Sequence, residues 1–257
     1  GIRDVAVTGV QTCALPISIV DTRGFGTANA GHSHAHALHF TLRLGDVDVL
    51  IDPGTYTYVG DPVLRNQFRG TASHNTIRID GLDQADPAGP FRWVNLPRTQ
   101  LLDWSAQPWR LDATCSYRGI LHRRQMTFVG GLLFVLDQID GEGVHLLEQF
   151  WHPGGFVEML GSRLLRLPGG VFIALSDDSD SLEATNEYGW YSDALGSKVC
   201  RPLIRVAKEV SLPYRLATAF MFSPQERPDG LDVESSAEGI RLKCAGQRAD
   251  FAASKRK

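Results

Sequence analysis

Histidine is concentrated in one short segment of the chain. Four of the eight histidines fall within residues 31–39, GHSHAHALH. Side chains two residues apart project to the same side of an extended segment, so His32, His34 and His36 could face one site together. Neutral imidazole is a common ligand of transition metals and a frequent acid or base in catalysis. The spacing therefore indicates a metal or acid–base site, although a functionless surface segment rich in histidine would show the same pattern.

A carboxylate, Asp52, follows the histidine segment in the sequence, and a hairpin between them would bring the two together. Residues 40–44 alternate between apolar and polar side chains, Gly45 begins a two-residue turn, and residues 47–51 return as a second strand. In the simplest register, His39 lies opposite Asp52. The predicted hairpin thus returns Asp52 to the neighbourhood of the histidine segment.

One further histidine could complete a set of ligands. His74 opens the strand predicted at residues 76–80, after the loop that follows the hairpin. Two imidazoles, a carboxylate and an open position for water form a plausible zinc site. On spacing alone, His34, His36 and His39 are all candidates for the other imidazole.

Short strands separated by turns dominate the chain from residue 40 onward, and helical periodicity is scarce. After the first hairpin, the predicted strands are residues 76–80, 124–129, 132–139, 144–150, 164–167, 171–175, 214–222, 231–233 and 240–243. Such a series predicts an all-β fold, a large antiparallel β-sandwich of two or more stacked, jelly-roll-like sheets. Residues 61–73 are predicted to form a loop or a short helix, and residues 83–93 a long loop.

Composition limits the classes of function. With 257 residues and a hydrophobic fraction of 43%, the chain can bury a sizeable core. A formal charge of −3 gives no global attraction to polyanions, so nucleic acid is not an expected partner. No apolar run reaches the about 18 residues that a membrane span requires, so no span is expected.

The two ends of the chain are expected to lie outside the folded domain. Residues 7–18, VTGVQTCALPIS, resemble a translated sequencing-library adapter rather than natural protein. Residues 1–21 are therefore predicted to be adapter-derived or disordered, without a role in the core. The β-sandwich domain is assigned to residues 22–244, followed by a frayed basic tail at residues 245–257.

Three blocks of sequence resemble the C-terminal β-sandwich domain of heparinase II/III-like polysaccharide lyases. In chain order, the blocks are GHSHAHALHFTL, IDPGTYTYVGDP and FRGTASHNTIRIDGLDQ. The resemblance runs from about Gly31 to Pro224. It adds an expected fold and activity to what the residues alone indicate.

The resemblance also implies roles for individual residues. It places His32 at the catalytic cleft and makes His34, Asp52 and His74 the ligands of a zinc ion. Members of this family often have Asp or Asn where this chain has His36. That difference removes a carboxylate near the metal and could add a competing imidazole.

The activity implied by the resemblance is the cleavage of an acidic, uronate-containing polysaccharide by β-elimination. This reaction needs a base for the C5 proton, an acid for the leaving oxygen and neutralisation of the carboxylate. In the family, most of these groups come from an α/α-toroid domain that precedes the sandwich, and that domain is expected to be missing here. The resemblance therefore implies a periplasmic or secreted bacterial lyase whose isolated C-terminal fragment is inactive.

Aromatic and basic side chains near these blocks are candidates for chemistry or substrate binding. Tyr56 could act as acid and base, as could Tyr58, although aromatic packing is the commoner role. Arg69 is the favoured contact to an acidic sugar, since guanidinium matches carboxylate and sulfate bidentately. Trp190 could stack on a sugar ring. The other candidate arginines are Arg65, Arg78 and Arg92. The scattered histidines are expected to pair locally or to line a cleft: His122, His145 and His152.

Two other functions are compatible with parts of the sequence. The main alternative is a non-catalytic carbohydrate-binding or structural β-sandwich of an exopolysaccharide-related protein. A jelly-roll metal enzyme that uses the His-x-His pair directly is a third possibility, but it leaves the DPGTY and SHNTI blocks unexplained.

Overall fold

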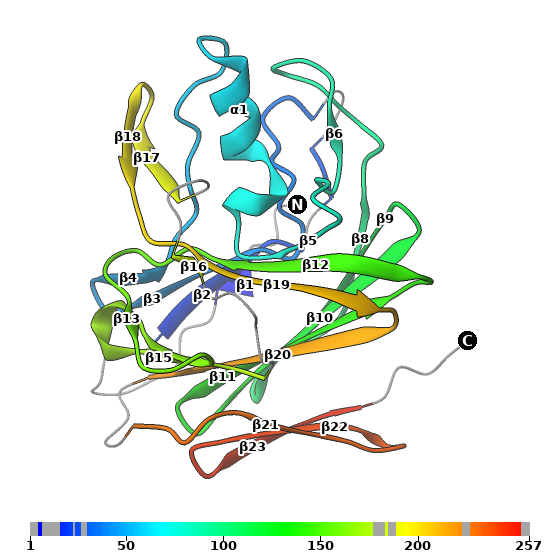
Figure 1. The fold of residues 1–257 in the computed structure, drawn as a ribbon, viewed down its shortest axis with the longest axis vertical. Helices are drawn as coiled ribbons and strands as arrows, with labels where there is room; N and C mark the ends of the chain where they lie inside the picture. The colour runs from blue at the N-terminus through cyan, green and yellow to red at the C-terminus, as the bar shows by residue number, and fades with distance from the viewer. Residues whose placement is uncertain are drawn as a thin grey trace.

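Antiparallel strands form three stacked layers (Figure 1). The computed structural model describes residues 5–6, 16–22, 24–26, 30–176, 183–184, 189–222 and 227–252. Within these ranges, helix is limited to α1 (Pro62–Arg69) and two 3-10 turns, η1 (Thr71–Ser73) and η2 (Pro168–Gly170). The predicted all-β class with stacked antiparallel sheets is confirmed.

The first layer consists of two four-stranded sheets that meet edge to edge. One sheet has the order β1 (Val5–Ala6), β2 (Pro16–Val20), β3 (Phe40–Leu44), β4 (Val47–Leu50). The other has the order β16 (Glu183–Ala184), β19 (Ile204–Ser211), β12 (Val144–Trp151), β5 (Ile77–Ile79). The backbone N–H of Ile51 donates to the carbonyl of His152 at 2.9 Å, which joins the two sheets just beyond β4 and β12.

The second and third layers are a large sheet and a small C-terminal sheet. The large sheet has the order β13 (Glu158–Met159), β14 (Leu164–Arg166), β15 (Phe172–Leu175), β20 (Tyr214–Met221), β11 (Leu132–Asp140), β10 (Ile120–Val129), β9 (Trp109–Tyr117), β8 (Arg98–Ala106). The small sheet has the order β21 (Asp232–Ser235), β22 (Gly239–Cys244), β23 (Gln247–Ala252). The first layer and the small sheet lie on opposite sides of the large sheet (Figure 1).

Strand β11 is buried on both faces because it lies in the middle layer. Leu133 and Val135 belong to the core that the large sheet shares with the first layer. Leu132, Phe134 and Leu136 belong to a second core, which the C-terminal sheet covers. The nearly continuous apolar run of this strand is the pattern expected of a strand with no face open to solvent.

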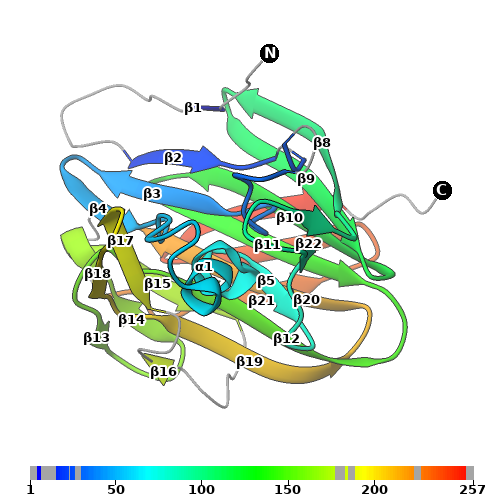
Figure 2. The ribbon, with the colours of Figure 1, turned by 90° about the horizontal axis from the view of Figure 1, so that it is seen from above.

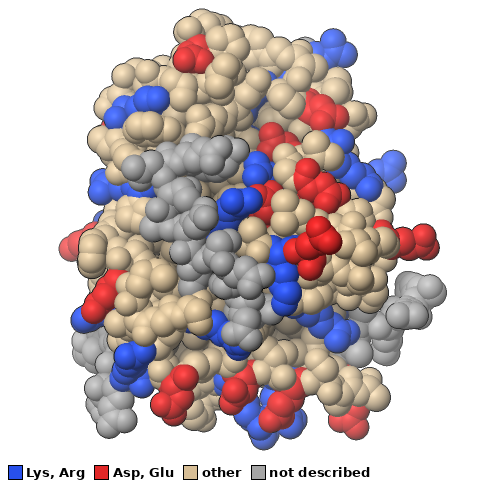
Figure 3. Space-filling model, viewed as in Figure 1, with Lys and Arg blue, Asp and Glu red and all other residues tan. Residues whose placement is uncertain are grey.

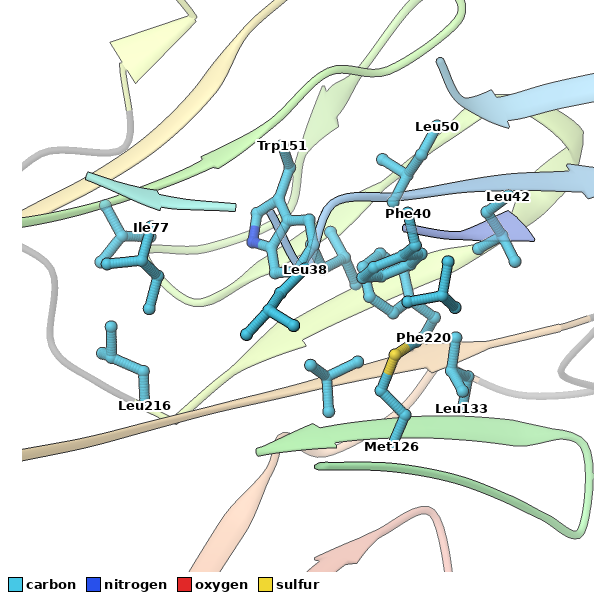
Figure 4. Packing of buried hydrophobic residues seen from close by; sticks show 14 of the residues in the cluster. Leu38, Phe40, Leu42, Leu50, Ile77, Met126, Leu133, Trp151, Leu216 and Phe220 are labelled. Carbon is cyan, nitrogen blue, oxygen red and sulfur yellow. The ribbon is translucent and has the colours of Figure 1, made fainter. Parts of the chain in front are cut away.

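Aromatic side chains fill the centre of the first core (Figure 4). The ring of Trp151 packs edge to face against Phe40 and Phe220, with centroid separations of 5.5 and 5.2 Å. All three side chains are fully buried. Each buried ring of this size contributes roughly 1.5–3 kcal/mol to stability relative to an exposed one. Because Phe40 begins β3, this packing fixes the end of the histidine segment on the core.

A cap of helix, loops and short ladders covers the first layer, and α1 lies beside the β17–β18 hairpin there (Figures 1 and 2). Besides α1 and η1, the cap comprises β6 (Asp86–Pro87), β7 (Trp93–Val94), β17 (Trp190–Ala194) and β18 (Ser197–Cys200). Helix α1 begins where the Asp61 side chain accepts from the backbone N–H groups of Val63 and Leu64 at 2.9 and 3.0 Å. The segment predicted as a loop or short helix is therefore a helix followed by a 3-10 turn.

Both ends of the chain contribute strands where none was expected. Val20 of β2 is buried in the first core, and β2 pairs with β3 along its whole length. The expectation that residues 1–21 have no role in the core is wrong for this strand. The tail expected to fray from residue 245 instead forms β23, whose Phe251 is buried in the second core. Residues 1–4, 7–15 and 253–257, on which the rest of these two expectations falls, lie outside the described residues.

Charged side chains of both signs are interspersed over the face shown in Figure 3. This mixture agrees with the small net charge of the sequence. None of the helices in the described part of the chain is long and apolar enough to cross a membrane.

Candidate metal centre and cleft

Two overlapping groups of metal-binding side chains lie where the histidine segment meets the first hairpin. The first comprises His34, His36 and His74, and the second comprises His39, Asp52 and His74. Within each group, one ligand atom from every side chain lies within 4.8 Å of the others. His74 belongs to both groups, whereas the predicted ligands His34 and Asp52 fall in different ones. The structure thus gathers all the candidate ligands into one cluster around His74.

The first hairpin delivers Asp52 to this cluster, as the sequence predicts. The register of β3 and β4 shifts by one residue between Leu42 and Arg43, yet the hairpin still returns the chain to the histidines. Asp52 Oδ1 accepts from the backbone N–H of Gly54 at 2.9 Å, which orients the carboxylate. Its Oδ2 lies 3.4 Å from His39 Nε2 and 3.2 Å from His74 Nδ1.

The hydrogen bond made by His39 disfavours it as a ligand. Its Nδ1 accepts from the backbone N–H of Asn75 at 2.8 Å, so the proton of the neutral ring is on Nε2. The protonated Nε2 faces Asp52 and cannot offer a lone pair to a cation. His39 is therefore suited to orient the Asp52 carboxylate, in the manner of an outer partner of a metal ligand.

His74 has the environment of a metal ligand. The side chain is fully buried, and neither ring nitrogen has a hydrogen-bond partner among the described residues. Burial lowers the pKa of His74 well below its ordinary value, and the nearby rings of His36 and His152 lower it further. Burial likewise lowers the pKa of His34, with His74 contributing. These imidazoles are therefore neutral at physiological pH, and a nitrogen- and oxygen-donor set of this kind fits zinc.

A buried polar network holds the cluster from below. Arg124 Nη1 donates to the carbonyl oxygens of Leu38 and Asn75 at 2.7 and 2.8 Å. The same guanidinium forms two bonds with Asp137, Nε to Oδ1 at 2.7 Å and Nη2 to Oδ2 at 2.9 Å. Burial alone would raise the pKa of Asp137, but Arg124 and a hydrogen bond from His122 hold it far below its ordinary value. The pair is therefore ionised inside the core.

Asn75 connects the strands that carry the site. Its side-chain amide donates to the carbonyl oxygens of Phe40 and Ile51 at 2.8 and 3.0 Å. Its Oδ1 accepts from the backbone N–H of His152 at 2.6 Å. The asparagine of the SHN block thus ties the ends of the first hairpin to the end of β12. Sequence reasoning gave it no role, because an isolated asparagine carries no signal of burial.

Residues of the cap form hydrogen bonds with the backbone of the histidine segment. Gln84 Oε1 accepts from the backbone N–H of Ala37 at 2.7 Å, and its Nε2 donates to the carbonyl of the same residue at 3.1 Å. The backbone N–H of Ala35 donates to the carbonyl of Arg69 at 2.8 Å. These bonds replace a strand ladder, since the segment runs through turns and Leu38 has a φ of 62°.

His32 does not join the other histidines, because the segment is not extended. Its exposed ring contacts Tyr58 and Phe91, with centroid separations of 5.4 and 6.0 Å. The side chains of His32, His34 and His36 nevertheless line one pocket together with Asp21, as their spacing predicted, while the His32 ring packs apart from the metal cluster. The separation agrees with the two roles that the resemblance implies, a cleft histidine beside a metal ligand.

A basic and aromatic surface lies beside the cluster, formed by Tyr56 and the β17–β18 hairpin. The ring of Tyr56 stacks on Phe68 of α1 with a centroid separation of 5.5 Å. Lys198 Nζ lies 4.2 Å from the centre of the Trp190 ring and 5.1 Å from that of Tyr56. Lys198 was not among the predicted site residues, although it lies in the same hairpin as Trp190. We name Tyr56, Trp190 and Lys198 the cationic shelf.

Arg69 occupies a position that does not suit the predicted contact with substrate. The side chain is fully buried and donates to the carbonyl oxygens of Gly89 and Pro90 at 2.8 and 3.1 Å. Its guanidinium also lies 4.4 Å from the centre of the Trp93 ring. Arg69 therefore fastens α1 to the loop at residues 83–93. Of the other arginines, Arg65 is also buried, Arg78 pairs with Glu148, and Arg92 is exposed.

The scattered histidines pair locally. His122 Nε2 lies 2.7 Å from Asp137 Oδ1 inside the core, and Nδ1 of the half-buried His145 lies 2.7 Å from Asp80 Oδ2. Local pairing of these two is confirmed. His152 does not line a cleft: it is buried, and its Nε2 donates to the Ala72 carbonyl at 3.0 Å.

The burial of His152 predicts a loss of stability in mild acid. Burial lowers its pKa to about 4, against the opposing effects of the Ala72 hydrogen bond and Asp52. An unfolded histidine titrates near about 6.5, so the unfolded state takes up the proton first as the pH falls. The free energy of unfolding should therefore decrease between about pH 6.5 and 4. The other buried histidines, whose pKa values are also lowered, act in the same direction.

Denaturant unfolding of the metal-free protein across this pH range tests the prediction. In His152→Gln, the change in the free energy of unfolding with pH should be smaller by about 1.4 kcal/mol per pH unit, which is the contribution of one proton. His145→Gln is the matched control: hydrogen bonding to Asp80 raises the pKa of His145, so this histidine is protonated in both states below about pH 6.5 and its loss should leave the slope there unchanged. Its stabilisation is present below the unfolded pKa and is lost as the pH rises through the folded one. An unchanged slope in His152→Gln would contradict the prediction.

The fold and the histidine–aspartate cluster together define an antiparallel β-sandwich with a candidate metal centre. The chain matches the family described as heparinase II/III-like, C-terminal, over residues 19–228, and it belongs to that family. The resemblance carried by the three sequence blocks is thereby confirmed. A comparison with curated proteins found no match.

Solved structures of heparinases share the fold. A mutant of the heparan sulfate lyase HepC from Pedobacter heparinus superposes with a TM-score of 0.74 at 17% identity, covering 93% of this chain and 39% of that one. A heparinase III gene product superposes with a TM-score of 0.73 at 18% identity, again covering 93% of this chain and 39% of that one. Another heparinase III structure superposes with a TM-score of 0.68 at 16% identity, with the same coverage of the two chains. The chain thus spans about two fifths of the length of these structures.

Proposed function

We propose that this chain is the C-terminal domain of a polysaccharide lyase that cleaves an acidic, uronate-containing polymer by β-elimination. The observation that carries the proposal is the placement of His32 and Tyr56 in one cap, next to a buried cluster of candidate zinc ligands. Membership of the heparinase II/III-like family supports the reaction class. The rest of the active site would come from a helical, α/α-toroid domain of the same protein, which acts in the periplasm or outside the cell.

The exposed His32 and the partly exposed residues of the cationic shelf suit an anionic substrate. His32 is exposed and lies against Tyr58, so its ring can hold or accept a proton at the edge of the cap. The ammonium of Lys198 on the cationic shelf can pair with a carboxylate or sulfate, while Trp190 can stack on a sugar ring. The phenol of Tyr56 can donate a proton to a leaving oxygen.

Zinc is the cofactor that we propose for the buried cluster. His34, Asp52 and His74 would hold it, since both nitrogens of His74 are buried and have no hydrogen-bond partner in the described part of the chain. When bound, the ion supplies fixed positive charge and crosslinks the histidine segment, the hairpin and the start of β5. The domain's own residues then hold the cap in place over the first layer.

The test is an assay for unsaturated uronate products, followed by absorbance of the new double bond. A protein that joins this chain to its helical domain should release such products from a uronate polymer, and His32→Ala should reduce the rate by about 100-fold or more, as for a lost acid–base group. The isolated chain should have little activity, because groups of the helical domain are needed to complete the active site. Saccharide binding by the joined protein without any unsaturated product would favour the alternative of a non-catalytic binding module.

A further inference from the structure

We propose that His36 is itself a ligand of this metal, through Nδ1, and that Asp21 is the carboxylate that orients it. The inference rests on the proposed zinc site and adds to it a residue to which the sequence assigned no definite role. It also changes the character of the site, because the coordination sphere would then be filled by the protein.

The contact between His36 and Asp21 fixes which nitrogen is available. His36 Nε2 lies 3.1 Å from Asp21 Oδ2, and the Asp21 side chain is only 11% exposed. A neutral imidazole that donates Nε2–H to this carboxylate must leave the lone pair of Nδ1 unprotonated. The backbone of Asp21 is fixed as well, since it pairs with Leu38 and His39 at 2.9 and 2.8 Å.

The free nitrogen of His36 is buried, and the ring lies beside the cluster. His36 Nδ1 is buried and has no hydrogen-bond partner among the described residues. The His36 ring lies 5.0 Å from that of His74 and 5.7 Å from that of His34, measured between centroids. A buried lone pair without a donor is costly, and a cation would satisfy it. A histidine held by a carboxylate on one nitrogen and free on the other is the usual arrangement of a metal ligand.

The distances allow one ion to be shared. The ligand atoms of His34, His36 and His74 lie within 4.8 Å of one another. Tetrahedral zinc with bonds of about 2.0–2.1 Å needs ligand atoms about 3.3 Å apart, so small side-chain rotations suffice. Asp52 lies 3.2 Å from His74 Nδ1 but belongs to the other group, so its carboxylate must rotate further to complete a set of four protein ligands. Such a closed set is typical of structural zinc and leaves no position for a reactive water.

The experiment is a competition titration of zinc against a chromophoric chelator, on the whole chain. His36→Ala should lose more than about 100-fold in affinity, beyond the about 10–100-fold that loss of an outer partner costs. Asp21→Asn, which retains every ligand, should lose about 10–100-fold. The matched controls are His145→Ala and Asp80→Asn, a partly exposed histidine–carboxylate pair outside the cluster, and they should remain within about twofold of wild type.

A second measurement separates coordination from a merely structural effect. In cobalt-substituted wild-type protein, added imidazole should leave the visible spectrum unchanged, because no coordination position is open. In His36→Ala, added imidazole should restore zinc affinity and change the cobalt spectrum. Wild-type affinity in His36→Ala, alongside a loss in His34→Ala, would overturn this inference and leave the proposed zinc site standing. Failure of the wild-type chain to bind zinc would overturn both.

Discussion

Chelation of zinc is expected to lower the melting temperature of the chain by about 8–16 °C. At a free zinc concentration of about 1,000 times the dissociation constant, binding stabilises the native state by about 4 kcal/mol. For a domain of this size, each kcal/mol shifts the melting temperature by about 2–4 °C. This shift in melting temperature is large because the ion would crosslink the histidine segment, which is held by turns and isolated hydrogen bonds and not by a strand ladder.

His74→Ala should abolish this difference between metal-replete and chelated protein. His74 is the only residue shared by both candidate ligand groups in the described part of the chain, so neither group survives its loss. Thermal melts with and without chelator, combined with elemental analysis, measure the effect. The control is His145→Ala, which should keep the full response to chelator. Stoichiometric zinc in the His74→Ala protein would refute the assignment.

Asp137→Asn is expected to destabilise the fold by about 3–5 kcal/mol, the cost of leaving one member of a buried ion pair without its partner. Arg124 and Asp137 are both fully buried, and the amide cannot neutralise the guanidinium. Because Arg124 also holds the carbonyl oxygens of Leu38 and Asn75, the affinity for zinc should fall as well.

Chemical denaturation and zinc titration of Asp137→Asn test the two effects separately. Asp103→Asn is the matched control, since Asp103 pairs with Arg110 at 2.9 Å while both side chains are about half exposed. Loss of an exposed pair should cost less than about 1 kcal/mol. Equal losses of stability in the two variants would show that the buried pair has no special role.

Local patterns were sufficient to predict several hairpins, among them β3–β4 and β10–β11, and the return of Asp52. Gly45 and Gly130, with φ values of 58° and 56°, occupy turns where a left-handed conformation is required, and this requirement is visible in the sequence. The hairpin of β8 and β9 was not predicted. β9 does alternate, with Leu111 and Ala113 buried, but the solvent-exposed side chains of β8 carry no such period.

The sequence predicted most residues of the candidate site, but it predicted their positions relative to one another only in part. Spacing brought the histidines into one segment, but His32 lies in a turn closed by the Ser33 N–H and the Ala30 carbonyl, and its ring packs against Tyr58. Arg69 belongs to a recognised block, yet its burial depends on a loop about 20 residues further along the chain. The contribution of Asp21 depends on pairing beyond the end of β2, in a part of the sequence that was expected to be unstructured. Contacts between residues so far apart in the chain cannot be predicted from the local sequence pattern.

The close approach of two loops has a consequence for how the cap responds to ligands. The backbone N–H of Ser192 donates to the carbonyl of Pro53 at 2.8 Å, and a Cβ at Gly54 would overlap the Ser192 carbonyl oxygen. The β17–β18 hairpin therefore cannot shift without moving the residues that follow Asp52. A saccharide that reorients the hairpin would change the affinity of the cluster for its cation, and the cation would change saccharide affinity by the same factor. The proposed saccharide and metal sites would then be linked through the contact of Gly54 with Ser192.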